Sequence, residues 1–186
     1  RCSNGDEQSL KDMEIYNLIK QKKLMSQSGN SDVMNNILSR LGILEYFTVF
    51  VDKNSSNFLP YHNLNHTKHM VLNCYEGAFC EGLSFEETVG VCLGAIFHDF
   101  NHSGGHKTDD VNVQIALEGF KQVHLNMPVK VCEESFNIAC ECIEITQYPY
   151  IKEPSTTHEM IIRDADLMEI FEPNYDNLER QFIGLK

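Results

Sequence analysis

His98 and Asp99 form an adjacent pair of ionisable residues at the end of a long apolar segment. If that segment is a buried helix, the pair loses its water, and a buried charge requires compensation. A divalent metal ion would provide it, because imidazole nitrogen and carboxylate oxygen together suit zinc, iron, manganese or nickel. The alternative is an ordinary helix C-terminus, at which His98 interacts with the helix dipole and Asp99 caps a neighbour.

Three further histidines, His62, His66 and His69, lie upstream in the segment YHNLNHTKHM. This segment predicts a helix that begins near Tyr61, with Pro60 just ahead of its first turn. Residues four apart share one helix face, so His62 and His66 would point into the same cavity. Three surface histidines on a helix would show the same spacing, and the context has to decide between the two interpretations.

Two aspartates lie in the late segment RDADLMEIF, residues 163–171. Asp166 follows Ala165 and precedes a leucine, so we expect its side chain to point inward. Asp164 is expected to pair with Arg163 or with solvent. The alternative is an ordinary solvated aspartate pair.

The elements that must position these residues are helices, because segments of helical period dominate and alternation of apolar and polar residues is almost absent. The fold class is therefore predicted to be all-α. A chain of 186 residues forms one domain with a real core, and a second complete domain would be cramped. We therefore expect a single domain over residues 1–186, with helices at 9–25, 33–41, 61–82, 85–99, 111–123, 157–171 and 175–185 and another that starts at Pro128.

Several local signals support these helices. Ser84 offers an N-cap with Glu87 three residues on, the spacing of a capping box. The helix that follows is apolar nearly all round from 89 to 97, which places it in the centre of the core. Asp109 or Asp110 is expected to cap the next helix. The apolar run LEYFTVFVD, residues 44–52, is either a buried helix or an extended connection.

The net charge of -12 and the pI near 5.0 argue against duplex nucleic acid as a partner. A small anionic substrate remains compatible with this charge if bound divalent cations supply local positive charge. No run of about eighteen apolar residues is present, so no membrane span is expected. The odd number of cysteines, seven, favours reduced thiols and hence a cytoplasmic location. The oligomeric state is left open.

The order His66, then His98-Asp99, then a distant Asp166 resembles the H…HD…D metal signature of the HD-domain phosphohydrolase superfamily, an all-helical fold. Within that superfamily, YHNLNH, FHDFNHSG and DADL resemble the Y-H-N-x-x-H, H-D-x-x-H-P-G and C-A-D-L motifs of the class I 3′,5′-cyclic nucleotide phosphodiesterases. The resemblance covers residues 61–171. It implies a helical domain around a central site for one or two metals.

The resemblance also implies roles for individual residues. The ligands of the first metal would be His66, His98, Asp99 and Asp166, with Asp99 shared with a second metal. Zinc with magnesium or manganese is expected, and iron is an alternative. His62 would be the general acid that protonates the leaving oxygen. Substrate-binding positions would be Tyr61 and His102. His106 is a further candidate for substrate binding because its loop adjoins the expected site, and a solvated loop is the alternative.

The activity implied by this resemblance is metal-dependent phosphoric ester hydrolysis. We expect a phosphodiesterase that uses a metal-activated water on 3′,5′-cyclic nucleotides or another small nucleotide phosphoester. The alternatives are a nucleotide phosphomonoesterase on the same fold, a di-iron oxygenase and a degenerate regulatory module. The oxygenase is motivated by the additional histidines His124 and His158. The sequence departs from the family at two motifs. SGGHK at 103–107 replaces P-G-T-N-N, and ITQ at 145–147 replaces A-T-D.

Overall fold

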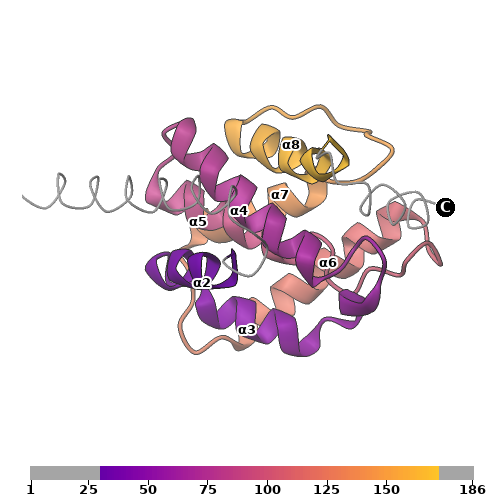
Figure 1. Ribbon diagram of the computed structural model, residues 1–186, viewed down its shortest axis with the longest axis horizontal. Coiled ribbons are helices and arrows are strands. Elements are labelled where there is room, and N and C mark those ends of the chain that lie inside the picture. Colours follow the sequence, from indigo (N-terminus) through magenta and orange to yellow (C-terminus); the bar gives the residue numbers. More distant parts are fainter. Residues whose placement is uncertain (1–29, 172–186) are drawn as a thin grey trace, which may run out of the picture.

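The computed structural model describes residues 30–171 of the chain, which contain seven α-helices, one 3-10 helix and no strand. The predicted all-α class is therefore confirmed for this part of the chain (Figure 1). The predicted helices at 9–25 and 175–185 lie outside the described residues. The elements are α2 (Asn30–Arg40), α3 (Leu44–Lys53), η2 (Ser55–Phe58), α4 (Leu64–Cys80), α5 (Phe85–Phe97), α6 (Asp109–Asn126), α7 (Glu133–Ile145) and α8 (Thr157–Phe171).

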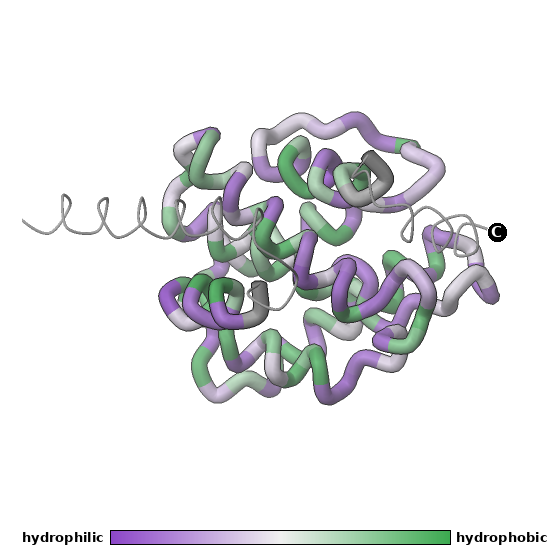
Figure 2. The backbone as a smooth tube through the Cα atoms, viewed as in Figure 1, coloured by the Kyte–Doolittle hydropathy of each residue, from purple (hydrophilic) through white to green (hydrophobic). Residues whose placement is uncertain are grey.

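Helix α5 is the centre of the bundle and contacts α3, α4, α6, α7 and α8. All nine residues from Val89 to Phe97 are buried, as their apolar character predicts. The helix begins with the predicted capping box, in which Ser84 and Glu87 satisfy each other's backbone N–H groups. Figure 2 shows hydrophobic and hydrophilic residues interleaved along the surrounding helices, as expected where only one face is buried.

Glycines allow the helices next to α5 to approach closely. A Cβ atom on Gly94 would lie 2.5 Å from Cβ of Cys142, so α5 and α7 pack almost backbone to backbone. A Cβ atom on Gly77 would lie 2.9 Å from Cγ2 of Ile161, at the contact between α4 and α8. These contacts set the spacing of α5 from α7 and of α4 from α8.

The start of α4 differs from the prediction, because the helix begins at Leu64 and not near Tyr61. Asn63 is the N-cap: its backbone is extended, and its side-chain oxygen accepts hydrogen bonds from the N–H groups of Asn65 and His66. Tyr61 and His62 therefore precede the helix. The expectation that His62 and His66 share a helix face is wrong, although both still reach the same region.

The starts of three other helices also differ. Helix α6 begins at Asp109 after the N-cap Thr108, so the acidic pair lies in the first turn, where it complements the helix dipole. Helix α7 begins at Glu133 and not at Pro128, because the N–H of Val131 bonds to the hydroxyl of Tyr46 and holds the preceding segment out of the helix. Helix α2 begins at 30 rather than 33.

The run at 44–52 forms helix α3, which settles the alternative left open by its sequence. Within the described residues no helix is both long and apolar enough to cross a bilayer. The six cysteines described are free; Cys80 and Cys132 are exposed, and the other four are buried or half-buried.

Candidate metal centre

Four side chains from three helices converge in the interior of the bundle. Nε2 of His66, on α4, lies 3.1 Å from Nε2 of His98, which is the C-cap residue of α5. Oδ1 of Asp166, on α8, lies 3.2 Å from Nε2 of His66 and 3.8 Å from Nε2 of His98. Oδ2 of Asp99 lies 3.1 Å from Nε2 of His98 and 3.5 Å from Nε2 of His66. The predicted convergence of these residues is therefore present.

These separations suit ligands of one cation. Donor atoms about 2.1 Å from a metal ion lie about 3.0 Å apart at right angles and about 3.4 Å apart in a tetrahedron. His66, His98 and Asp166 form a group of potential metal ligands in the structure, with the two histidines buried. Nitrogen and carboxylate donors of this kind suit zinc, manganese and iron. The residues present therefore fit a divalent ion.

The orientation of His98 is set by a backbone contact. Its Nδ1 lies 2.9 Å from the carbonyl oxygen of Ala95, one turn earlier in the chain, and a carbonyl can only accept a hydrogen bond. Nδ1 is therefore the protonated nitrogen, and Nε2 keeps its lone pair directed at His66 and the two carboxylates. A second hydrogen bond of this type is the usual way in which a protein fixes a histidine ligand.

Asp99 is a buried carboxylate, only 8% exposed. Burial opposes its ionisation, but the neighbouring His62 and His98 hold the pKa of the carboxyl well below its usual range. Burial likewise opposes protonation of His98, and the charge of Asp99 nevertheless raises the pKa of that imidazole. The carboxyl of Asp99 is therefore ionised in the interior, as a ligand of a cation must be.

The backbone that carries Asp99 is held by the segment 54–57. The hydroxyl of Ser56 donates to the carbonyl oxygen of Asp99 at 3.2 Å. Two residues on, Asn101 has a φ of 58°, and its backbone N–H donates to the side-chain oxygen of Asn54 at 2.8 Å. The side-chain oxygen of Asn101 accepts in return from the N–H of Ser55. The helix end is thereby turned so that Asp99 faces inward.

A second group of potential ligands adjoins the first and consists of His62, Asp99 and His102. Nδ1 of His62 lies 2.9 Å from Oδ2 of Asp99, and the rings of His62 and His102 stack with centroids 3.7 Å apart. Nε2 of His102 lies 3.1 Å from the amide nitrogen of Asn112, which is buried on α6. Asp99 thus lies between the two groups, which is compatible with one or two ions.

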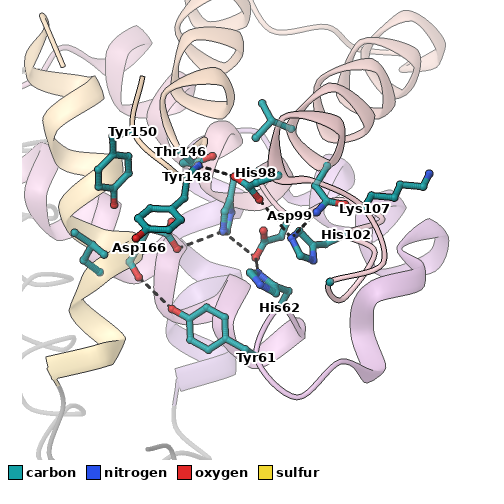
Figure 3. Close-up of a pocket in the computed structure, with 15 residues that line it drawn as sticks. Tyr61, His62, His98, Asp99, His102, Lys107, Thr146, Tyr148, Tyr150 and Asp166 are labelled. Carbon is teal, nitrogen blue, oxygen red and sulfur yellow. Dashed lines mark hydrogen bonds and ion pairs between the residues drawn. The ribbon is translucent and has the colours of Figure 1, made fainter. Parts of the chain in front are cut away.

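Both groups border a cavity of about 600 Å³. Figure 3 shows Tyr148 and Tyr150 on one side of it, beside Asp166, and His62 and His102 on the other. Its lining combines imidazoles and carboxylates with aromatic and aliphatic side chains, a composition typical of small-molecule sites. The lining residues are Tyr61, His62, His98, Asp99, His102, Gly105, Lys107, Asp109, Asn112, Val113, Thr146, Tyr148, Tyr150, Asp166 and Leu167.

Most of the predicted site residues lie at this cavity or directly behind it. Tyr61 lines the cavity, and its hydroxyl donates to the backbone carbonyl of Asp166 at 3.3 Å. His66 is buried beneath it, with the ring of Tyr61 at 4.7 Å. Asp164 is exposed, as expected. His106 is different: it is exposed and does not line the cavity, so the geometry gives no support for its predicted contact with substrate.

The additional histidines lie elsewhere in the described part of the chain. His124 is half-buried, with Nδ1 2.8 Å from the hydroxyl of Tyr46. His158 is 8% exposed, with Nε2 2.9 Å from a carboxylate oxygen of Glu141. Neither belongs to the two ligand groups. The geometry therefore gives no support to these two histidines as the additional ligands that a di-iron oxygenase would need.

Sequence reasoning assigned no role to several residues of the cavity. Asn112, Tyr148 and Tyr150 come from α6 and from the loop between α7 and α8, and tertiary contacts alone bring them to the site. Thr146 was noted only as part of a departure from a family motif. Comparisons of the chain with protein-family models, with curated proteins and with solved structures find no match. Functional inference therefore rests on the geometry of the centre.

Proposed function

We propose that the protein is a metal-dependent phosphohydrolase of the HD-domain type, and that it acts as a phosphodiesterase on small nucleotide phosphoesters. The observation that carries this proposal is the convergence of four side chains at the wall of a cavity that His62 also lines. The carboxylate oxygens of Asp99 and Asp166 lie within 3.8 Å of Nε2 of both His66 and His98. The ordered motifs from 61 to 167 support the same assignment.

His66, His98, Asp99 and Asp166 would hold the ion. When bound, a divalent ion supplies positive charge to phosphoryl oxygens and lowers the pKa of a water nucleophile. This source of charge is needed because the chain carries a net charge of -12. The cavity itself contributes Lys107, an exposed cation at its rim. A small anion such as a phosphoester is the substrate class that this combination favours.

His62 is suited to proton transfer. Its side chain is 20% exposed and lines the cavity, and its Nδ1 donates to the carboxylate of Asp99. The remaining nitrogen, Nε2, is then the atom that can deliver a proton to the leaving oxygen. The backbone just before the N-cap Asn63 holds His62 outside the helix, so it reaches the cavity independently of His66. His102 and Asn112 would orient the phosphate beside it.

The proposal is tested by elemental analysis of the purified protein, followed by a phosphoester panel with and without chelator. The expected result is metal-dependent release of a nucleoside monophosphate from a 3′,5′-cyclic nucleotide. Release of inorganic phosphate from nucleoside monophosphates would instead identify a phosphomonoesterase. Absence of both activities in metal-loaded protein would contradict the proposal.

A matched pair of variants on α8 links activity to the centre. Asp166→Asn is expected to lose bound metal and activity together, because it removes a charged ligand that lies 3.2 Å from His66. Asp164→Asn makes the same chemical change two residues away at an exposed position and is expected to preserve both. Equal effects of the two substitutions would show that the centre does not hold the metal.

A further inference from the structure

The segment between α7 and α8 brings two tyrosines to the cavity on the side opposite His62. Tyr148 is 67% exposed and Tyr150 is 37% exposed, so neither ring is buried in the core. Their centroids lie 5.5 Å apart with ring planes at 88°, an edge-to-face arrangement. Both rings line the cavity beside Asp166 (Figure 3). Large aromatic side chains left at the rim of a polar site are available to contact a ligand.

The same segment is fixed at several points. Arg163, buried on α8, donates through its guanidinium to the carbonyl oxygens of Ile145 at 3.0 Å and Lys152 at 2.6 Å, which flank the tyrosines. Its guanidinium carbon lies 4.0 Å from the ring centroid of Tyr150. The backbone N–H of Tyr148 donates to a carboxylate oxygen of Asp109 at 2.6 Å. The planar guanidinium can make these contacts together, which a lysine cannot.

We propose that Tyr148 and Tyr150 form a subsite for a planar ring of the substrate, and that Arg163 is the residue that positions this subsite. The identity of the ring-bearing ligand as a phosphoester rests on the function proposed above. Aromatic side chains favour stacked or edge-to-face contact with other rings, and a tyrosine fixed by its surroundings loses little entropy on binding. The phosphate would lie at the metal ligands and the ring at the tyrosines, within one cavity of about 600 Å³.

Two probes with the same phosphate and sugar separate the contribution of the ring. Adenosine 5′-monophosphate and ribose 5-phosphate differ by the base alone, and calorimetry on metal-loaded protein measures the dissociation constant of each. Stacking of a base on an aromatic side chain changes affinity by roughly fivefold to a hundredfold. We expect adenosine 5′-monophosphate to bind more tightly by a factor in this range.

Variants assign that preference to the subsite. Tyr148→Ala and Tyr150→Ala should each reduce the ratio of the two dissociation constants towards one, whereas the corresponding changes to Phe should preserve it. Ile151→Ala is the matched control, because Ile151 is 79% exposed on the same segment and does not line the cavity. Arg163→Lys should lower the ratio while leaving binding of ribose 5-phosphate unchanged, a separation that general loss of structure would not produce.

An unchanged ratio in both alanine variants overturns the subsite, and so does equal binding of the two probes to the unsubstituted protein. The subsite is also overturned if Ile151→Ala reduces the ratio of the two dissociation constants as much as the tyrosine variants do. Failure of the proposed function is distinguished by the hydrolysis panel. A preserved ring preference without any phosphoester hydrolysis supports the subsite and contradicts the enzyme assignment alone.

Discussion

Nε2 of His66 and Nε2 of His98 face each other at 3.1 Å in the interior, where the two side chains are 1% and 2% exposed. Because Nδ1 of His98 donates to the carbonyl of Ala95, its Nε2 presents a lone pair. A neutral His66 that also presented its Nε2 lone pair would repel His98 at this distance. A cation shared with Asp99 and Asp166 converts the arrangement into a favourable one, which is why the first prediction concerns metal and stability.

Added zinc is expected to raise the free energy of unfolding of metal-free protein. A ligand that binds only the folded state stabilises it by about 2.7 kcal/mol at one hundred times its dissociation constant. Denaturant unfolding in buffered free zinc measures the effect. His66→Gln should abolish the zinc-dependent increase. His106→Gln, at an exposed position away from the ligand groups, should retain it, and a loss there would argue against the centre described above.

Replacement of Asp99 and of His62 should have separable effects. Asp99→Ala removes a carboxylate that belongs to the second ligand group and contacts both histidines of the first, so metal content and activity should both be lost. His62→Ala should retain metal and slow hydrolysis by roughly a hundredfold to ten-thousandfold, the usual contribution of a general acid. Mass spectrometry measures the metal content of each variant, and steady-state kinetics measures its kcat. A His62→Ala protein that loses one equivalent of metal would identify His62 as a ligand rather than the acid.

Glu159 predicts a change in stability at acidic pH. Burial opposes its ionisation, but the ammonium of Lys152 and the N–H and hydroxyl of Ser155 lower the pKa of this carboxyl to about 2. A carboxyl with a depressed pKa in the folded state stabilises the fold above its unfolded pKa, near 4.5, and this stabilisation is lost as the pH falls towards 2.

Glu159→Gln should therefore cost up to roughly 3 kcal/mol at neutral pH and much less at pH 2, since one pKa unit corresponds to about 1.4 kcal/mol. Denaturant unfolding at several pH values measures the difference from the unsubstituted protein. Glu153→Gln is the control, because that side chain is 94% exposed. A difference between Glu159→Gln and the parent that does not change between pH 4.5 and 2 would contradict the account.

Gly94→Ala is expected to destabilise the protein by about 1–3 kcal/mol, the usual cost of overpacking a core. The new Cβ atom would lie 2.5 Å from Cβ of Cys142, which cannot move without moving α7. Gly77→Ala meets only the side chain of Ile161, at 2.9 Å, so its strain is smaller, and the gain in helix propensity of about 1 kcal/mol applies to both substitutions. In thermal unfolding, the melting temperature of Gly94→Ala should therefore be lower than that of Gly77→Ala. The reverse order would be inconsistent with the α5–α7 contact.

The central part of the fold was predictable because it depends on local signals. Ser84 and Glu87 specify the start of α5, and an uninterrupted buried run specifies its place in the core. The candidate ligand positions were predicted from the resemblance to the HD-domain motifs. Residue type gave partial support, because His98 and Asp99 come at the end of that run and Asp166 lies among apolar neighbours.

The parts that were not predictable depend on contacts between distant residues. The start of α4 is an exception, because Asn63 caps the helix locally and begins it after Tyr61 and His62, although Pro60 indicated an earlier start. Pro128 gave the same type of signal, and a hydrogen bond to Tyr46 overrides it. The tyrosines of the cavity carry no periodic pattern at all, because a loop held by side chains of two other helices places them there.

Arg163 and Asp166 lie three residues apart on α8. One helix therefore supports both the rim that carries Tyr150 and a ligand of the centre, and a displacement of α8 would move the two together. The distance between the metal centre and the aromatic rim is therefore set within a single helical turn, and it would be kept even if the loop that carries the tyrosines changed in length.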